Sequence, residues 1–304
     1  MLLKGLMFEV DSPVCTNPEN EFPMWLSPEH TRDVLPKDVN GIMIRVKTYA
    51  PLACGIIVNS TRELEIPVVK ALSDIDSMRT KSIFMVGPLI PTAGLSSTKQ
   101  QQARLVTEWL SSKERNSVLY ISFGTIISPS PEQLSEMASA FLAMNRPFIW
   151  SLPDTLRLEL PDEIRSRMSD STTDFLVLDW VPQKTILAHF ATAAFLSHCG
   201  WNSTIEALCC GVPIICWPLC SDQDMNVELV LKHGAGIRVQ GTGWKAERTV
   251  YAQEIVQLIN HVISKELYRT KALEASRMLN KAVGPGGSSA VDFANLIQQL
   301  SQKF

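Results

Sequence analysis

The sequence lacks the features that mark several large classes of protein. It has no run of about 18 or more apolar residues, so no membrane-spanning helix is expected. The first residues, MLLKGLMFEV, form too short an apolar run for a secretory signal, and the acidic residues Glu9 and Asp11 interrupt it. The net charge of −3 offers no basic field for nucleic acid or for an anionic membrane, so neither is an expected partner.

Several motifs of catalysis and cofactor binding are also missing. There is no GxGxxG after a strand, no GxxxxGK[ST], no GxSxG and no HExxH, which disfavours nicotinamide, P-loop, serine-hydrolase and zincin functions. Seven cysteines are present, but none form a CxxC pair. Because their number is odd and Cys209 and Cys210 are adjacent, we interpret them as reduced thiols of a cytoplasmic protein, not as a metal site or a disulfide framework.

The chain does contain enough apolar residues for a large core. Its 304 residues are 45% hydrophobic and 19% charged, which is ordinary for a globular protein of two domains. Short apolar runs alternate with longer amphipathic stretches, which predicts strands alternating with helices. The expected strands are residues 55–59, 82–86, 117–123, 148–152, 175–178, 193–197, 213–217 and 235–239. The expected helices are residues 63–71, 104–111, 131–143, 185–190, 202–210, 223–232, 252–264, 265–281 and 290–302.

This alternation predicts an α/β fold with a parallel sheet that helices cover on both faces. Residues 88–102, PLIPTAGLSSTKQQQ, are rich in Pro, Gly, Ser, Thr and Gln, so we interpret them as a linker. Ligands of such sheets bind beyond the carboxyl ends of the strands, at the point where the strand order reverses. The loops that follow residues 117–123, 175–178, 193–197 and 213–217 are therefore the candidate site.

The first two of these loops carry a glycine and a tryptophan. Gly124 and Thr125 follow the first strand, where a glycine lets a ligand approach closely and a hydroxyl can donate to phosphate. Glycine after a strand is also common in purely structural turns. Trp180 ends the second strand, where its ring is either part of the core or a stacking platform for a base.

The third loop, HCGWNS at residues 198–203, is the most informative. A helix that begins there presents free N–H groups and the positive end of its dipole, which together can hold a diphosphate. Asn202 and Ser203 would add side-chain donors. Ser203 and Glu206 also fit a capping box, in which both side chains only satisfy main-chain N–H groups, so the local sequence leaves both interpretations open.

The fourth loop contains Asp222, Gln223 and Asp224 in succession. A carboxylate beside an amide can bind two sugar hydroxyls. The triplet also spells DxD, which in a different fold holds a metal–nucleotide complex. We favour the first interpretation and expect no metal, because a helix dipole already balances the charge of a phosphate.

These loops together form one long composite pattern. Residues 180–223 contain W-x-P-Q, then H-C-G-W-N-S, a glutamate three residues later, G-V-P and a closing D-Q. The segment resembles the donor-binding signature of the plant secondary-product UDP-glycosyltransferases, in family 1. GIIVNSTRELE at residues 55–65, FMVGPL at residues 84–89 and SFGT at residues 122–125 resemble further parts of that family. The resemblance covers essentially the whole chain and is weakest over the first 50 residues.

The resemblance implies how a uridine nucleotide would be held. Trp180 would stack on uracil, and the main chain of Val181 would read the edge of the base. Gln183 and Glu206 would bind the ribose hydroxyls.

The resemblance assigns the remaining residues to the diphosphate and the sugar. Those at the diphosphate are Thr125, His198, Asn202 and Ser203, with Gly200 in the same turn. Those at the sugar are Trp201, Asp222 and Gln223. A closing glutamine goes mostly with glucose in the family, so UDP-glucose is the expected donor.

The resemblance also implies a GT-B fold of two Rossmann-like domains, the N-terminal one incomplete. Residues 1–97 would be the remnant of an acceptor-binding domain with its linker, residues 98–285 the UDP-sugar-binding domain, and residues 286–304 a helix crossing back to the N-terminal domain. Transfer would go to a hydroxyl of a small lipophilic acceptor, with inversion and without metal or another cofactor.

One departure from the family concerns the general base. In the family, a histidine in a G-H-x-x-P turn near the start of the N-terminal domain deprotonates the acceptor, and an aspartate orients that histidine. We expect this chain to begin after both, and the context of His30 differs from that turn, so no catalytic residue is assigned. The alternative to a transferase is therefore a catalytically inactive UDP-sugar-binding pseudoenzyme or regulatory isoform.

Overall fold

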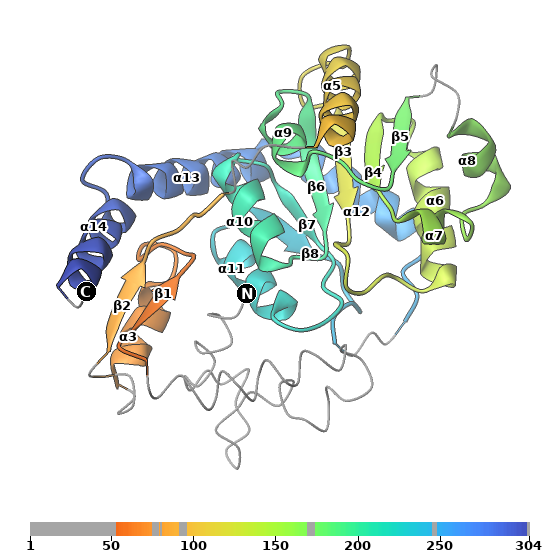
Figure 1. Cartoon of the computed structure of the whole chain (residues 1–304). Helices are drawn as coiled ribbons and strands as arrows, with labels where there is room; N and C mark the ends of the chain where they lie inside the picture. The colour runs from red at the N-terminus through yellow and green to blue at the C-terminus, as the bar shows by residue number, and fades with distance from the viewer. Residues whose placement is uncertain are drawn as a thin grey trace. The chain divides into compact units, whose positions relative to one another are not determined.

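The computed structural model describes residues 53–74, 79, 81–90, 96–168, 174–244 and 248–302 (Figure 1). His30, to which we assign no catalytic role, lies outside these residues. By its internal contacts the chain divides into two compact units, Met1–Pro91 with Arg277–Phe304, and Thr92–Ser276. The sequence-based boundaries at residues 97/98 and 285/286 stay a prediction. None of the described helices is long and apolar enough to cross a membrane.

The first unit contains two short parallel strands and the last helix of the chain. Strand β1 (Gly55–Val58) pairs with β2 (Ser82–Met85), α3 (Ile66–Asp74) connects them, and α14 (Ser288–Ser301) packs on β2. The carboxylate of Asp292 on α14 accepts the main-chain N–H of Met85 at 2.8 Å and the guanidinium of Arg62 at 3.0 Å. These bonds and the apolar cluster of Phe84, Val86 and Leu296 fix α14 to the strand.

The second unit is a fully parallel sheet of six strands in the order β5-β4-β3-β6-β7-β8 (Figure 1). Its strands are β3 (Val118–Ser122), β4 (Phe148–Ser151), β5 (Phe175–Leu178), β6 (Thr192–Ser197), β7 (Ile214–Cys216) and β8 (Gly236–Arg238). Its helices include α5 (Ser97–Ser111), α6 (Pro131–Ala143), α9 (Gln183–Ala188), α10 (Trp201–Cys209), α11 (Gln223–Lys232) and α12 (Ala252–Ser264). Helix α13 (Glu266–Val283) spans the boundary between the two units.

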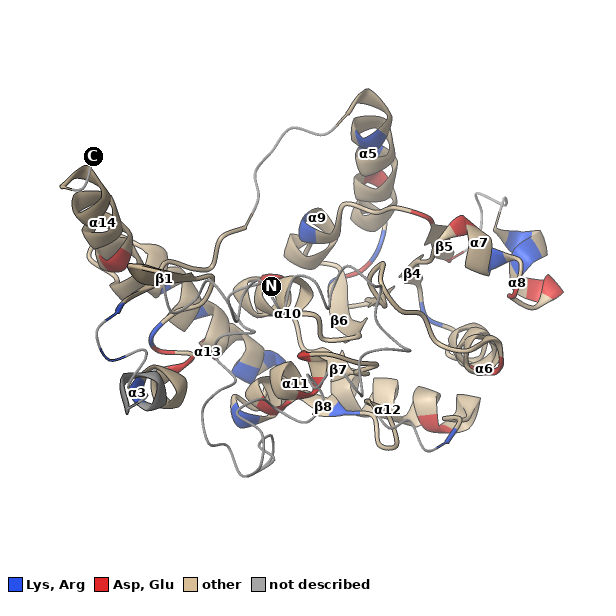
Figure 2. Ribbon diagram, turned by 60° about the horizontal axis from the view of Figure 1, so that its bottom comes forward, with Lys and Arg blue, Asp and Glu red and all other residues tan. Residues whose placement is uncertain are grey.

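Both faces of the central strands are buried, as expected for a parallel sheet. Alternate residues of β3 face opposite ways: Leu119 and Ile121 pack in the core with α6 and α12, while Tyr120 points to the other face and stacks on Phe195 of β6 at 4.5 Å between ring centroids. Strands β6 and β7 carry no charged residue, whereas the surface helix α8 (Asp162–Arg167) carries charges of both signs (Figure 2).

The α/β fold and every expected strand are confirmed, to within two residues at each end. The helix predicted over residues 131–143 is also confirmed, and the Ser130 hydroxyl caps it by accepting the N–H of Gln133 at 3.2 Å. The adjoining helices of residues 252–281 break at Lys265.

Three predictions about helices were wrong. The first helix begins at Ile66 and not at residue 63. The interpretation of residues 88–102 as a linker fails for residues 97–102, which form the start of α5 behind a Ser96 cap. The short helices α7 (Asp154–Arg157) and α8 were not expected.

Candidate functional site

The strand order reverses between β3 and β6, which places the candidate site. The chain winds outward from β3 to β4 and β5, then returns to the other side of β3 as β6. The carboxyl ends of β3 and β6 are therefore the switch point at which sheets of this kind bind ligands. Gly124 follows β3 and His198 follows β6, so the structure brings together two loops that lie more than 70 residues apart in sequence.

His198 lies in a cradle that two glycines form. A Cβ atom added to Gly124 would lie 2.7 Å from His198 Nε2, and one added to Gly200 would lie 2.5 Å from the same atom. Gly124 also has a φ of +74°, which side-chain-bearing residues rarely adopt. Both positions therefore require glycine if the imidazole is to keep its place.

The imidazole of His198 is partly buried, and it is incompletely bonded. Its Nδ1 has no hydrogen-bond partner in the part of the chain that the structure describes. Burial lowers the pKa of His198, and the main chain of Ser122 and the carboxylate of Asp222 oppose that shift without cancelling it. The ring is therefore neutral at neutral pH and able to take up a proton when an anion arrives.

Helix α10 begins immediately after this histidine. Gly200 is its N-cap and supplies no side chain, so the first N–H groups of the helix are available to an anion. Asn202 in the first turn is exposed. The capping-box interpretation of Ser203 and Glu206 was wrong, because the helix starts at Trp201 and the Ser203 position is already its third residue.

A network of polar side chains joins α9, α10 and β3. Gln183 Nε2 donates to Glu206 Oε2 at 2.8 Å and to Ser203 Oγ at 3.2 Å. Gln183 Oε1 accepts the hydroxyl of Tyr120 at 3.0 Å. The two residues predicted at the ribose, Gln183 and Glu206, are thus direct neighbours.

Trp180 is partly exposed and contacts α5. Its main-chain carbonyl accepts Gln102 Nε2 at 2.6 Å, and the ammonium of Lys99 lies 4.9 Å from the centroid of its ring. A cation over one ring face leaves the other face for a planar ligand. The next residue, Val181, is buried, so a contact to a base would come from its main chain, as predicted.

The loop after β7 is organised by buried amides. Gln223 Oε1 accepts the N–H groups of Leu219 at 2.6 Å and Cys220 at 3.0 Å, and its Nε2 lies 3.7 Å from Cys220 Sγ, to which it donates. Asn226 Nδ2 donates to the Cys199 carbonyl at 2.8 Å and to Asp222 Oδ2 at 3.2 Å, and so ties this loop to the turn after β6.

Trp201 and Thr125, which were predicted at the sugar and at the diphosphate, differ in exposure. The ring of Trp201 is buried, with 4% exposure, which restricts a contact to its edge or its main chain. Thr125 is exposed beside Gly124. The roles of both residues stay predictions.

Asp224, the last residue of the DxD triplet, is engaged elsewhere. It pairs with Arg238 at 2.5 Å and accepts the N–H of Trp244 at 3.4 Å. Among the described residues, no three His, Cys, Asp or Glu side chains lie close enough to hold a metal ion.

Sequence reasoning missed four residues of this site: Lys99, Gln102, Tyr120 and Asn226. The first two fell in the presumed linker. Tyr120 carried a usable signal, because a tyrosine in the middle of a buried strand needs a partner for its hydroxyl. Asn226 on α11 carried none, since a single asparagine in an amphipathic helix is ordinary.

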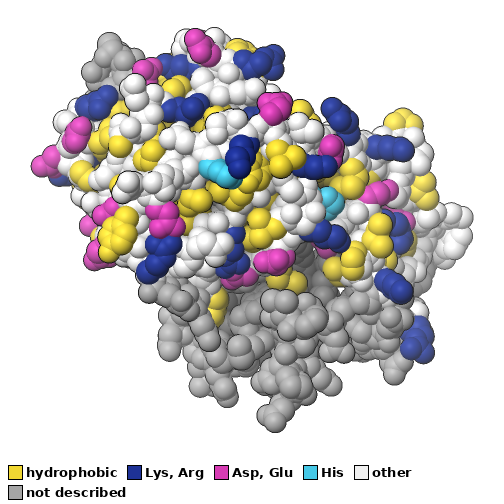
Figure 3. All heavy atoms as spheres, turned by 180° about the vertical axis from the view of Figure 1, so that it is seen from behind, with side chains coloured by type: hydrophobic (Ala, Val, Ile, Leu, Met, Phe, Trp, Pro, Cys, Tyr) yellow, Lys and Arg dark blue, Asp and Glu magenta, His cyan; other side chains and the backbone are white. Residues whose placement is uncertain are grey.

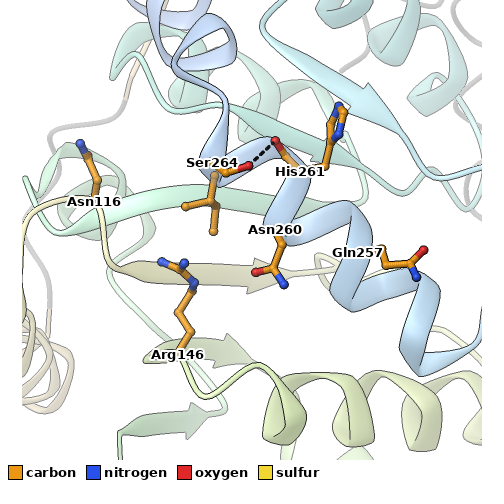
Figure 4. A pocket seen from close by; sticks show the side chains of 7 residues that line it. Asn116, Arg146, Gln257, Asn260, His261 and Ser264 are labelled. Atoms are coloured by element: carbon orange, nitrogen blue, oxygen red, sulfur yellow. Dashed lines mark hydrogen bonds between the residues drawn. The ribbon is translucent and has the colours of Figure 1, made fainter.

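Apart from the candidate site, a hollow lies at the amino end of the same sheet. It has a volume of about 620 Å³, and it is lined by Asn116, Arg146, Gln257, Asn260, His261, Ile263 and Ser264. Arg146, just before β4, and Asn260, on α12, extend toward it (Figure 4). Arg146 Nη1 donates to the Ser117 carbonyl at 3.2 Å.

The described part of the surface that Figure 3 shows in colour carries acidic, basic and apolar side chains mixed together.

Sequence comparison relates this chain to a known family of enzymes. A family model described as UDP-glucoronosyl and UDP-glucosyl transferase matches residues 57–285. Anthocyanidin 3-O-glucosyltransferase 2 of Fragaria ananassa is 34% identical over 83% of this chain and 54% of its own length. Cis-zeatin O-glucosyltransferase 1 of Zea mays is 36% identical over 83% of this chain and 58% of its own length. The chain thus spans somewhat more than half the length of these relatives.

Solved structures share the fold. UGT71G1 of Medicago truncatula, complexed with UDP-glucose, superposes with a TM-score of 0.78 at 29% identity, over 98% of this chain and 68% of that one. A ugt transferase from Siraitia grosvenorii in complex with UDP gives a TM-score of 0.77 at 27% identity, over 99% of this chain and 67% of that one. The α/β fold of this chain, with its parallel sheet, therefore matches these structures over about two-thirds of their length.

Proposed function

Because this chain belongs to the family of UDP-glucoronosyl and UDP-glucosyl transferases, we propose that it binds UDP-glucose and transfers the glucose to a hydroxyl of a small lipophilic acceptor. In that reaction the acceptor oxygen attacks the anomeric carbon while the bond from that carbon to UDP breaks. UDP leaves with the bonding electrons, a general base takes the acceptor proton, and the configuration inverts. The protein's task at the donor is to hold UDP and to stabilise the charge it gains.

The observation that carries the proposal is the position of His198. Its Nε2 lies between Gly124 and Gly200, at the switch point of the sheet and directly before the start of α10. The glycines leave the space that the imidazole fills, the helix supplies N–H donors to a diphosphate, and the neutral imidazole can become a cation beside the leaving group.

The remaining contacts follow the sequence prediction. Uracil stacks on the face of Trp180 opposite Lys99, Gln183 and Glu206 bind the ribose, and Asp222 with Gln223 Nε2 selects glucose. We also propose a GT-B arrangement of two Rossmann-like domains, and a cytoplasmic location.

Calorimetric titration of the 304-residue protein with UDP-glucose tests the proposal. We expect a dissociation constant in the micromolar to millimolar range. Trp180→Ala should weaken it about 5- to 150-fold, the equivalent of about 1–3 kcal/mol for one base stack. Trp109→Ala is the matched control, because Trp109 also has a lysine over its ring, Lys113 at 4.6 Å, but lies outside the site. Folded protein that binds no UDP-glucose would contradict the proposal.

A UDP-sugar-binding protein without transfer is the second candidate. It is favoured because the described residues form a donor site, while none of them is assigned as a general base. Release of UDP from UDP-glucose in the presence of small phenols and alcohols distinguishes the two. Binding with no acceptor-dependent release supports the second candidate.

A further inference from the structure

A buried tyrosine lies behind the residues proposed to bind the ribose. Tyr120 is the third residue of β3, is 1% exposed, and stacks on Phe195. A hydroxyl at such a position needs a hydrogen-bond partner, and the partner here is Gln183 Oε1 at 3.0 Å. The core of the sheet is therefore connected directly to the proposed nucleotide site.

The Tyr120 hydroxyl and the Glu206 carboxylate together hold the amide of Gln183 in one orientation. With Oε1 turned to Tyr120, Nε2 donates to Glu206 Oε2 at 2.8 Å and to Ser203 Oγ at 3.2 Å. If the amide turned over, Oε1 would face the carboxylate of Glu206. Nε2 could then donate to the Tyr120 oxygen, but the Tyr120 proton would lose its acceptor in Gln183. Burial raises the pKa of Tyr120. A hydrogen bond with the Ser122 side chain opposes that shift without cancelling it, and the charge of Glu206 adds to it, so the hydroxyl stays protonated and remains a donor.

We infer that Tyr120 is a positioning residue, which fixes the Gln183 amide so that Gln183 Nε2 and the Glu206 carboxylate together recognise the ribose hydroxyls of a uridine nucleotide. The inference rests on the proposed function and extends it from the two contact residues to the buried group that orients them.

The geometry indicates how a ribose hydroxyl enters the network. The Gln183–Ser203 bond is the longer of the two that Nε2 makes, so a ribose oxygen can replace Ser203 as the acceptor. The same hydroxyl donates its proton to Glu206. Ser203, once released, is free to contact the diphosphate. Only a group that accepts and donates at once satisfies both residues, and the analogue without that particular hydroxyl lacks it.

The test compares UDP with 2′-deoxy-UDP and 3′-deoxy-UDP, by calorimetry on the whole chain. The wild-type protein should prefer UDP over at least one of the two deoxy analogues. Tyr120→Phe should weaken UDP binding about 3- to 10-fold, the usual range for one hydrogen bond. The affinity of Tyr120→Phe for that deoxy analogue should stay within about twofold of the wild-type value, so the preference for UDP over the analogue shrinks. A merely structural role of Tyr120 would weaken all three ligands alike.

Two further variants distinguish a positioning role of Tyr120 from a merely structural one. Tyr268→Phe is the matched control, because its hydroxyl lies 3.1 Å from His261 Nε2 at the other end of the sheet, and we expect it to leave the preference unchanged. Gln183→Glu retains an acceptor for Tyr120 but removes both Nε2 donors, and should lower the preference as Tyr120→Phe does.

In a Gln183→Ala background, Tyr120→Phe should have no further effect on the preference, because Tyr120 acts only through that amide. An equal loss for all three ligands, or an effect that persists in the Gln183→Ala background, overturns the inference while leaving the proposed function intact. A wild-type protein that does not bind UDP overturns both.

Discussion

The two ends of the six-stranded sheet are built from the same strands but use their polar groups differently. At the carboxyl end, His198 is partly buried with its Nδ1 lacking a partner within the described residues, and Gly124 and Cys199 have positive φ angles of 74° and 62°. At the amino end, Arg269 donates to the carbonyls of Gly211 at 2.9 Å, Thr192 at 2.7 Å and Ala193 at 2.5 Å.

This difference separates binding from stability. The carboxyl end keeps an incompletely bonded imidazole, a feature that costs stability and persists where a ligand completes the bonding. The amino end satisfies main-chain carbonyls with guanidinium groups, which stabilises the fold. Substitutions at the carboxyl end should therefore change affinity for UDP-glucose, and those at the amino end should change stability.

The largest change in affinity is expected for Gly200→Ala. The new Cβ would lie 2.5 Å from His198 Nε2, so the imidazole must move. Loss of its charge-assisted contact to the diphosphate should weaken UDP-glucose binding about 10- to 150-fold. Calorimetry measures this, and the free energy of unfolding should fall by about 1 kcal/mol as well, because alanine is a poorer N-cap than glycine.

Gly284→Ala is the control for this substitution. A Cβ at Gly284 meets no atom closer than 3.4 Å, and its backbone is not in the left-handed region. Equal affinity of the Gly200→Ala variant and the wild-type protein would show that His198 does not contact the ligand.

A smaller effect is expected from pH. Burial lowers the pKa of His198, so the free protein holds a neutral ring and binding of the diphosphate brings a proton with it. UDP-glucose has no group that titrates near neutral pH. Its affinity should therefore rise about 3- to 10-fold from about pH 8 to about pH 6, the range in which a histidine titrates.

The stability of the free protein should follow the opposite trend. Because the folded-state pKa of His198 is depressed, the unfolded chain binds a proton that the partly buried ring does not. Stability contributed by the neutral ring is present above the unfolded pKa of about 6.5 and is lost as pH falls through the folded value. His198→Gln should abolish the pH dependence of affinity. A variant that keeps that dependence would assign it to another group.

The sequence located this site better than it described the site's bonding. All four loops were predicted, because fully buried strands such as β3 and β6 leave an unmistakable apolar run and the carboxyl ends follow from the strand boundaries. The sequence left a capping box at Ser203 open as one of two interpretations, and the structure excludes it because the helix begins at Trp201, ahead of the serine that the motif would need as its cap. A shift of two residues changed Ser203 from a cap into a partner of Gln183.

The contribution of α5 could not be predicted for a related reason. Its first residues, Ser97 to Gln102, have the composition of a linker, and only the packing of α5 against α9 gives Lys99 and Gln102 their contacts to Trp180. Tertiary contacts of this kind leave no periodic signal in a sequence.

The smallest change in affinity is expected at the amino end of the sheet. Arg269→Met leaves three carbonyls without their donor, at the starts of β6 and β7, and should lower the free energy of unfolding by about 2–4 kcal/mol. The affinity for UDP-glucose should stay within about twofold, because sites this far apart without shared partners behave independently. Urea unfolding and calorimetry measure the two quantities.

Arg269→Lys sharpens the same test. Lysine keeps the charge but not the planar fork, so it cannot reach the carbonyls of Gly211 and Thr192 together, and it should recover only part of the lost stability. Full recovery would mean that charge near the strand starts matters more than hydrogen bonding. If Arg269→Met lowers the affinity for UDP-glucose as much as Gly200→Ala does, the two ends of the sheet are coupled. The separation of binding from stability would then fail.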